Sequence, residues 1–379
     1  MKYLFVVFLL VSSLMAFEHK VEVALEAIGH SKDANEFVTS SNIDVNFKNS
    51  YFDIDARVEF LYSSKYIDKR YVLLNELYVT KEFDEYIFTI GKKIKYLGEL
   101  EGYNVADIYN QKNYLKDPFD KNAKYGSIGL DITKYFDENS IDFSIKFYEE
   151  GVKYSQNNKK LYLSNKKYTP TFYLGMNFLS DEYIDSETKI ILVHGYDIKR
   201  NILATSLTSP LYQYAYRVNK ILLLSHIIYE DIIYKTEISY TDVIKYDAIS
   251  DYAQLSFGFE KSFYEVLGSD ITLYGEYYSY IYTDDTKVKN IDISELYDND
   301  IFVALKVNFN DTKSSELKFG ILKDIKKDEQ IIKLEINSRM RDSFIINGEY
   351  INIISDDTNS VLNKFSDYSR FTVGIKYTF

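Results

Sequence analysis

The sequence lacks cysteine and tryptophan, and it has only 3 prolines and 4 histidines in 379 residues. Without cysteine there is no disulfide, no thiolate metal site and no lipid-modified N-terminal cysteine. The histidines have no spacing suited to a metal site; they are His19, His30, His194 and His226. A neighbouring pair such as Ser225 and His226 would point to opposite faces of a strand and cannot act as nucleophile and base. We therefore expect no enzymatic activity, no metal and no cofactor.

Long apolar runs are also missing. No stretch of about 20 apolar residues follows residue 16, which excludes a membrane-spanning helix. The formal net charge of −12 does not suit a nucleic-acid partner, because phosphate backbones attract basic surfaces.

Aromatic residues are abundant instead, with 38 tyrosines and 25 phenylalanines, although 27% of the residues are charged. A transmembrane β-barrel accommodates both features, because only alternate residues face lipid and aromatic side chains form girdles at the interfaces. A soluble β-rich or disordered secreted protein is the alternative. No linker or change of composition divides the chain, which predicts a single domain.

The N-terminal residues have the pattern of a secretory signal. Lys2 gives a basic start, residues 4–11 are apolar, and residues 12–16 end in small side chains at Ala16. We predict a signal peptide at 1–16 and a mature barrel at 17–379. The apolar run is too short to cross about 30 Å of hydrocarbon as a helix.

The C-terminal residues alternate with period two. One face carries Phe371, Val373, Ile375, Tyr377 and Phe379, and the other carries polar residues and Gly374. This ending resembles the C-terminal signature of Gram-negative outer-membrane proteins. The resemblance implies that Tyr377 and Phe379 are an assembly signal, recognised by the barrel-assembly machinery.

Charged residues alternate with apolar ones in several other stretches. In lipid, each charge would cost about 2–4 kcal/mol near the midplane, so we expect them to line a water-filled lumen. The predicted lumen wall consists of Asp53, Asp55, Arg57, Glu59, Lys235, Glu237, Lys333, Glu335, Arg339 and Arg341. For any single residue, an ordinary paired lumen charge without effect on selectivity is the simpler interpretation.

Strand-like stretches recur along the whole chain. We predict strands at 19–30, 42–48, 52–62, 71–81, 86–95, 125–134, 141–149, 171–179, 188–196, 211–228, 232–243, 252–264, 271–282, 301–309, 315–325, 331–340, 344–354 and 368–379. The stretch 211–228 is long for one strand, and 202–207 could form a short strand of its own. Eighteen antiparallel strands place both ends in the periplasm, and sixteen is the alternative. The long connections then fall on the outside, at 31–40, 96–124, 151–167, 197–210, 244–250, 283–298 and 355–366.

The segment 96–124 is the longest of these connections, and it mixes apolar and acidic residues in a way that a surface loop would not need. Loops of this length inside compact domains are usually functional. Gly91-Lys92-Lys93, Gly98 and the run from Asp107 to Gln111 resemble a poorly characterised porin-like family of proteobacterial outer-membrane proteins. Gln111 stands where the pattern of that family favours proline.

In porins generally, the long loop after an early strand folds into the barrel and narrows it. We therefore expect the third external loop to fold inward and form a pore constriction. Its acidic residues would face a basic strand end, and the opposed charges would create a transverse field; the residues are Glu99, Glu101 and Asp107 opposite Lys92, Lys93 and Lys95. A solvated external loop is the alternative. A further hypothesis is weak cation selectivity caused by the three acidic residues.

The functional prediction rests on the number of strands, because barrels of sixteen to eighteen strands leave an aqueous channel. We predict an outer-membrane porin, a passive channel for small hydrophilic solutes or ions in contact with membrane lipid, and possible trimers. The alternatives are a surface adhesin or binding protein on a barrel scaffold, and a gated, substrate-specific transporter.

Overall fold

The computed structural model of the chain describes residues 18–31, 33–152, 161–181, 184–203, 212–244, 248–284, 286–287, 296–341, 343–356, 360 and 362–379. The predicted signal peptide at 1–16 lies outside these residues.

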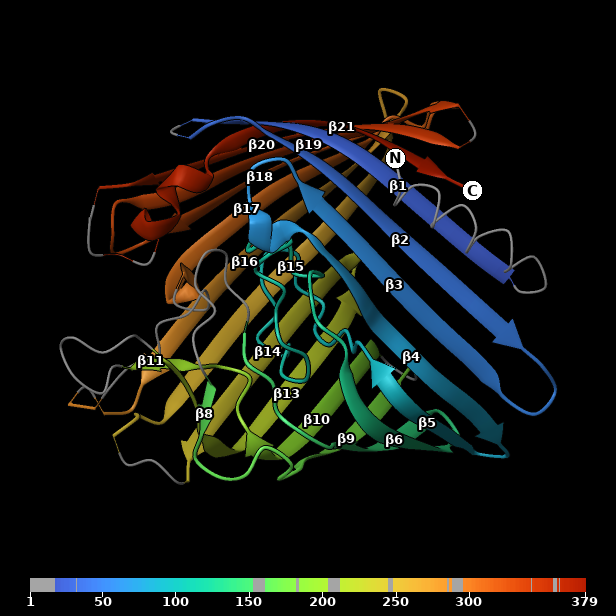
Figure 1. The fold of residues 1–379 in the computed structure, drawn as a ribbon, viewed down its shortest axis with the longest axis vertical. Helices are drawn as coiled ribbons and strands as arrows, with labels where there is room; N and C mark the ends of the chain where they lie inside the picture. The colour runs from blue at the N-terminus through green and yellow to red at the C-terminus, as the bar shows by residue number, and fades with distance from the viewer. Residues whose placement is uncertain are drawn as a thin grey trace.

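Eighteen antiparallel strands form one closed barrel (Figure 1). The first nine are β1 Glu18–His30, β2 Glu36–Lys48, β3 Asp53–Ser63, β4 Tyr71–Phe83, β5 Tyr86–Lys93, β6 Ser127–Phe136, β7 Asn139–Lys146, β9 Thr171–Ser180 and β10 Asp185–Tyr196. The other nine are β13 Arg217–Tyr229, β14 Ile232–Val243, β15 Tyr252–Val266, β16 Ser269–Tyr282, β17 Asn299–Asn308, β18 Glu316–Asp324, β19 Glu329–Arg341, β20 Phe344–Ser355 and β21 Arg370–Thr378. Each strand pairs with the next, and the prediction of an 18-stranded up-and-down barrel is confirmed.

Closure joins the two ends of the described chain. Strand β21 pairs antiparallel with β1. Beyond β21, the amide of Phe379 donates to the carbonyl of Val21 at 3.0 Å, and the amide of Val21 donates to the carbonyl of Phe379 at 2.8 Å. The last residue therefore completes the hydrogen bonding of the barrel wall, so no sheet edge is left open.

Tight turns connect the strands at one end of the barrel. Between β13 and β14, Glu230 and Asp231 both have positive φ, at 48° and 58°, as a two-residue type I′ hairpin turn requires. The long connections lie at the opposite end. Two of them contain strands of a separate three-stranded sheet, β8 Leu161–Leu163, β11 Asn201–Leu203 and β12 Tyr212–Ala215. Short 3-10 turns lie in two others, η1 Ile67–Lys69 and η3 Asn363–Tyr368.

Three predicted boundaries were wrong. Strand β2 begins at Glu36 rather than 42, because polar residues stand on both faces at 39–42 and hide the alternation. The predicted strand 211–228 divides at Tyr216 into β12, which leaves the barrel wall, and β13, which belongs to it. The predicted final strand 368–379 begins only at Arg370, because η3 occupies the preceding residues.

The outer face of the barrel is apolar. Large apolar side chains remain exposed on alternate positions, among them Leu25, Ile90, Val303, Phe371 and Ile375. Such a surface suits contact with lipid. Among the described residues, no helix is both long and apolar enough to cross a membrane.

Apolar side chains also meet inside the barrel, where the loop between β5 and β6 packs on the wall. One cluster joins Leu100 of this loop to Tyr278, Leu322 and Ile351 of three strands. A second joins Ala106, Ile108 and Tyr109 of the same loop to Tyr173, Ile191, Val193 and Leu222. This interior packing positions the site described next.

Candidate channel constriction

The loop between β5 and β6, residues 94–126, is called L3 below. Figure 1 shows it running inside the barrel. The prediction that the third external loop folds inward is therefore confirmed. Its position follows from five sets of contacts, some with the barrel wall and some within the loop.

The first anchor of L3 is Glu237 of β14, which is 2% exposed. Its carboxylate accepts hydrogen bonds from the backbone amide of Glu99 at 2.9 Å and from that of Ala106 at 3.0 Å. The approach needs a glycine at position 98, which has φ +89°. A Cβ there would lie 2.6 Å from Glu237 Oε1 and 2.7 Å from Asn104 Cβ, closer than van der Waals contact allows.

The second anchor lies on β16. The Glu276 carboxylate accepts the backbone amides of Glu101 at 2.6 Å and Gly102 at 2.9 Å. The Tyr278 hydroxyl donates to the same carboxylate and accepts the amide of Tyr103 at 3.0 Å. Charge-assisted bonds of this kind are about twice as strong as neutral ones. Two buried carboxylates thus hold the loop backbone against the wall strands β14 and β16.

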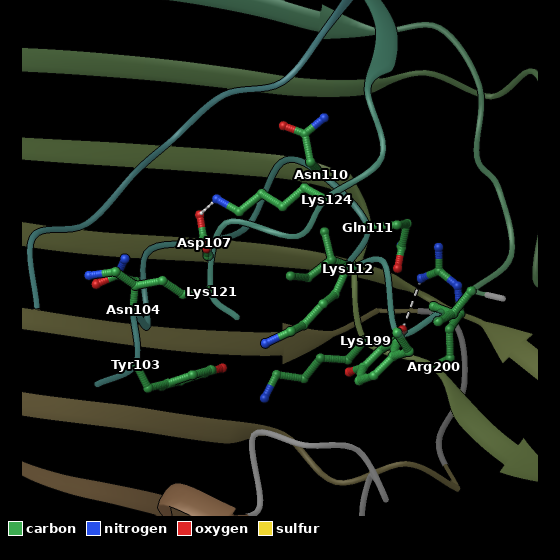
Figure 2. Close-up of a pocket in the computed structure, with 13 residues that line it drawn as sticks. Tyr103, Asn104, Asp107, Asn110, Gln111, Lys112, Lys121, Lys124, Lys199 and Arg200 are labelled. Carbon is green, nitrogen blue, oxygen red and sulfur yellow. Dashed lines mark hydrogen bonds and ion pairs between the residues drawn. The ribbon is translucent and has the colours of Figure 1, made fainter. Parts of the chain in front are cut away.

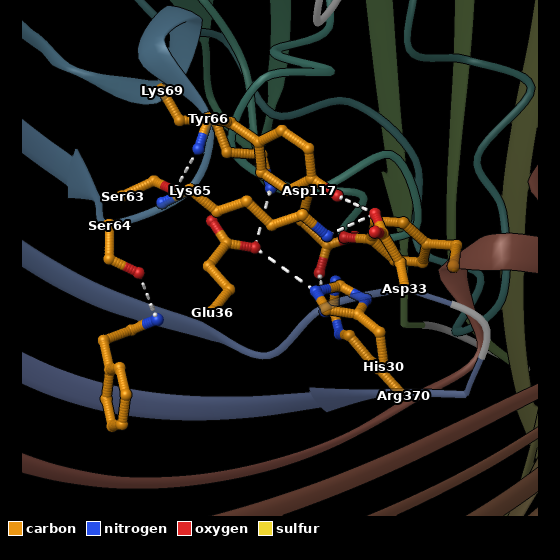
Figure 3. Close-up of polar contacts among 12 residues, drawn as sticks. His30, Asp33, Glu36, Ser63, Ser64, Lys65, Tyr66, Lys69, Asp117 and Arg370 are labelled. Carbon is orange, nitrogen blue, oxygen red and sulfur yellow. Dashed lines mark hydrogen bonds and ion pairs between the residues drawn. The ribbon is translucent and has the colours of Figure 1, made fainter.

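The third anchor ties L3 to the last strand. Asp117 accepts a hydrogen bond from Arg370 Nη2 at 3.0 Å and one from the Tyr368 hydroxyl at 3.0 Å. Figure 3 shows Asp117 and Arg370 beside the contact between His30 and Glu36. The Nε2 atom of His30 lies 3.3 Å from Oε2 of Glu36. Burial alone would raise the pKa of Asp117, but Arg370 and other cations outweigh it and lower the pKa to about 2. Asp117 is therefore a carboxylate at neutral pH.

The fourth set of contacts joins the two ends of L3. Asn110 accepts the backbone amide of Lys95 at 2.7 Å and donates to the carbonyls of Lys93 at 3.0 Å and Tyr125 at 2.9 Å. Asn75 of β4 accepts the amide of Gly126 at 2.8 Å. The loop therefore leaves and re-enters the wall as one tied unit.

The fifth set consists of side-chain ion pairs made by the predicted acidic residues. Glu99 Oε2 lies 2.9 Å from His226 Nδ1. Glu101 pairs with Lys318 of β18, and its Oε2 lies 3.7 Å from Lys121 Nζ. Burial would raise the pKa of Glu101, but the lysines, Lys121 foremost, outweigh it, so the pKa is lowered.

Asp107 pairs with Lys124 at 2.5 Å, within L3 itself. Here burial outweighs the lysine and raises the pKa of Asp107. Each of the three predicted acidic residues thus has a cationic partner or a histidine.

The predicted opposition of these acids to Lys92, Lys93 and Lys95 was wrong. Lys92 Nζ donates to the Leu74 carbonyl at 2.7 Å, and Lys93 Nζ lies 5.0 Å from the ring centre of Tyr78. Lys95 pairs with Asp131 and donates to Ser144 Oγ at 2.6 Å. The reason is the course of L3, which carries Glu99 to His226 of β13 and Glu101 to Lys318 of β18, whereas Asp107 pairs with Lys124 of L3 itself.

Most of the predicted lumen-wall charges are paired with neighbours. Arg57 Nε lies 2.6 Å from Asp44 Oδ1, and its Nη1 lies 3.1 Å from Glu76 Oε2. The other contacts are Asp53 with Lys48, Asp55 with Asn46, Glu59 with Asn75, Lys235 with Glu260 and Lys333 with Glu335. The side chains of Arg339 and Arg341 are exposed near the end of β19. The influence of these residues on selectivity stays a prediction.

The sequence reasoning missed several contacts of L3, namely Glu276, Tyr278, His226, Lys318 and Arg370. Alternation within their strands would have placed them on the inward face. Nothing in the sequence indicated which inward residues the loop reaches, because that depends on the path of a 33-residue connection across the barrel.

A cationic cavity of about 70 Å³ lies between L3 and the connection that precedes β13. Figure 2 shows Lys112 and Lys199 with their ammonium ends directed into the same space. Lys121, Lys124 and Arg200 also line it, and Asp107 is the one acidic residue among the described lining residues. Burial lowers the pKa of Lys112. The cavity nevertheless concentrates positive charge next to the loop.

Arg200 and Lys199 are themselves held in place. Arg200 pairs with Glu149, which also pairs with Lys146 at 2.8 Å. Lys199 Nζ lies 4.2 Å from the ring centre of Tyr280, a cation–π contact. The positive lining is thus built from buried and oriented side chains.

A closed 18-stranded antiparallel barrel with an apolar outer face and a loop tied inside it is a transmembrane-type channel scaffold. Several solved structures share this fold at low sequence identity. OccK2 (OpdF) of Pseudomonas aeruginosa aligns with a TM-score of 0.58 at 10% identity, covering 97% of this chain and 98% of its own. The same protein in complex with glucuronate aligns with a TM-score of 0.57 at 10% identity and the same coverage.

OccK11 (OpdR) of Pseudomonas aeruginosa aligns with a TM-score of 0.56 at 9% identity, covering 97% of this chain and 96% of its own. No protein-family model and no curated protein sequence matches the chain. Likeness at this identity establishes the shared fold.

Proposed function

We propose that the protein is an outer-membrane porin, a passive diffusion channel for small hydrophilic solutes or ions in which L3 forms the constriction. The observation that carries the proposal is the tie between L3 and the wall strands β14 and β16, through Glu237 and Glu276. A barrel of eighteen strands has room for water inside, and a loop fixed within it would narrow that space. We assign the protein no catalytic role.

The same proposal includes export and assembly. A signal peptide at 1–16 would direct the chain through the periplasm, and 17–379 would form the barrel in contact with outer-membrane lipid. Tyr377 and Phe379 would be recognised by the barrel-assembly machinery. Phe379→Ala tests this, because it removes the ring but keeps the two backbone bonds to Val21. Slower assembly in cells with unchanged refolding in detergent is expected. Chemical crosslinking would show whether the barrels associate as trimers.

For the solute class, we propose small anions, carboxylates among them. Support comes from the cavity, whose lining has five basic residues and one acidic residue; of the basic ones, Lys121, Lys124 and Arg200 pair with Glu101, Asp107 and Glu149. It also comes from the glucuronate complex of OccK2. The hypothesis that Glu99, Glu101 and Asp107 cause weak cation selectivity stays a prediction: Glu101 and Asp107 are paired with lysines, whereas the partner of Glu99 is His226.

Single-channel recording in a planar lipid bilayer under a salt gradient tests the proposal. Discrete conductance steps would establish an open pore, and the sign of the reversal potential would give its charge preference. Lys112→Met should reduce the preference for anions, whereas Lys326→Met, on an exposed turn after β18, should not. Silence from a demonstrably folded barrel would contradict the porin and favour the adhesin or a gated transporter.

A further inference from the structure

A second group of side chains lies where the segment of L3 around Glu99 meets strands β10 and β13. Glu187 of β10 and His226 of β13 are direct cross-strand partners, so they share one face of the sheet. His226 Nε2 lies 4.0 Å from Glu187 Oε2, and His226 Nδ1 lies 2.9 Å from Glu99 Oε2 of L3. One donor atom from each of the three residues lies within 4.8 Å of the other two.

The nearby lysines are engaged elsewhere. Lys189 and Lys235 line the same cavity of about 180 Å³. Lys189 Nζ pairs with Asp142 at 2.6 Å. Lys235 Nζ pairs with Glu260 at 2.8 Å and donates to the backbone carbonyl of Glu99 at 3.0 Å. The ion pairs of these two ammonium groups are thus made with Asp142 and Glu260, not with the two carboxylates that converge on His226.

The three side chains are accessible from water. Their exposed fractions are 47% for Glu99, 34% for Glu187 and 24% for His226. An ion can therefore enter the cavity and keep one or more water ligands. Histidine nitrogen with carboxylate oxygen is a donor set that zinc and its neighbours among the transition metals accept, whereas calcium and magnesium take oxygen ligands.

We propose that Glu99, Glu187 and His226 form a binding site for a divalent transition-metal ion of the zinc class. Two ligands of a tetrahedral zinc ion at about 2.0–2.1 Å lie about 3.3 Å apart. One ion binds only one nitrogen of His226, whereas Glu99 lies at Nδ1 and Glu187 at Nε2, so one carboxylate must turn toward the nitrogen that the other approaches. Because one donor atom of each residue lies within 4.8 Å of the other two, this turn requires a shift of about 1.5 Å. Because Glu99 belongs to L3 and the other two ligands to the wall, the bound ion ties the constriction loop to β10 and β13.

This site goes beyond the proposed channel function and is testable without conduction. Purified, folded protein in detergent is titrated with ZnCl₂ by calorimetry at neutral pH, and again in the presence of excess CaCl₂. We expect saturable binding of one ion that calcium does not displace. Glu99→Gln and His226→Gln should each weaken it at least 10-fold, because replacing even an outer-shell partner of a metal ligand costs about 10–100-fold in affinity.

The matched control is His194→Gln. His194 is exposed on β10 and contacts Asn219, outside the cavity, so its variant should bind zinc like the parent protein. Glu99→Gln changes only a loop side chain and leaves the barrel strands intact, which separates loss of binding from loss of folding. Absence of saturable binding, equal binding of calcium, or unchanged affinity in both site variants would each overturn the proposal. A non-conducting barrel that still binds zinc would contradict the channel alone.

Discussion

The tie between L3 and the wall predicts that two conservative substitutions should loosen the constriction. In Glu237→Gln, the carbonyl oxygen of the amide can still accept one backbone amide of L3. Its NH₂ group would face the other donor, from Glu99 or Ala106. The same argument holds for Glu276→Gln on β16.

A hydrogen bond to a charged group contributes about 1.5–3 kcal/mol. Losing one bond at each anchor therefore costs about 3–6 kcal/mol in the double variant, which raises the ratio of released to anchored L3 by about 10²–10⁴. The apolar packing of Leu100 and the contact of Asp117 with Arg370 remain. We therefore expect frequent excursions of the loop and not its complete loss.

Single-channel recording should show the excursions as greater open-channel noise and added conductance levels, and trypsin should cut L3 faster. Glu335→Gln is the matched control, because this inward carboxylate pairs with Lys333 of the same strand. Folding of each variant is checked by the heat-dependent mobility of the barrel in electrophoresis. Unchanged noise, conductance and proteolysis in a folded double variant would refute the anchoring argument.

Three further predictions concern L3. Gly98→Ala should increase open-channel noise, because the added Cβ would lie too close to the Glu237 carboxylate. The control is Gly268→Ala, at φ +81°, where an added Cβ meets nothing within 4 Å. This variant costs only the backbone strain of about 1–2 kcal/mol and should leave conduction unchanged. Glu101→Gln should shift the reversal potential toward anions. One charge at about 10 Å in water changes the energies of a cation and an anion by about 0.4 kcal/mol in opposite directions, which is about four-fold in their permeability ratio, measured at low salt. The pKa of Asp117 lies below its ordinary value of 3.8, so its anchor is stable above about pH 4 and weakens as the pH falls toward 2. Open-channel noise should rise over that interval in the parent but show no such step in Asp117→Asn.

The barrel could be predicted from the sequence because its rules are local. Alternation in segments such as 371–379 assigns each side chain to lipid or lumen, and eighteen such segments fix the closed fold. The prediction failed where both faces carry polar residues, as at 39–42, and where a strand leaves the wall, as at Tyr216. In both places the period-two signal gives no information about pairing.

The constriction could be predicted only in outline. Length and mixed composition indicated that L3 is functional. The prediction that its acidic residues face Lys92, Lys93 and Lys95 assumed that the loop stays near the end of its own strand. The partners that the structure assigns, such as Lys318 for Glu101, are separated by more than half of the chain. Contacts of that range depend on the complete barrel and leave no local pattern.

The anchors of L3 also change which residues can control selectivity. Glu237 and Glu276 are buried carboxylates, and their oxygens accept backbone amides of the loop. A carboxylate that is bonded to backbone amides is shielded from the solute path. This bonding does not depend on which side chains the loop carries. Control of ion preference therefore falls to the side chains that remain directed into water beside L3. Of the lysines beside L3, Lys112 and Lys318 differ in one respect: Lys318 is balanced by Glu101, whereas Lys112 lies in a cavity lined mainly by cations. Substitution of Lys112 should therefore change selectivity more than substitution of Lys318.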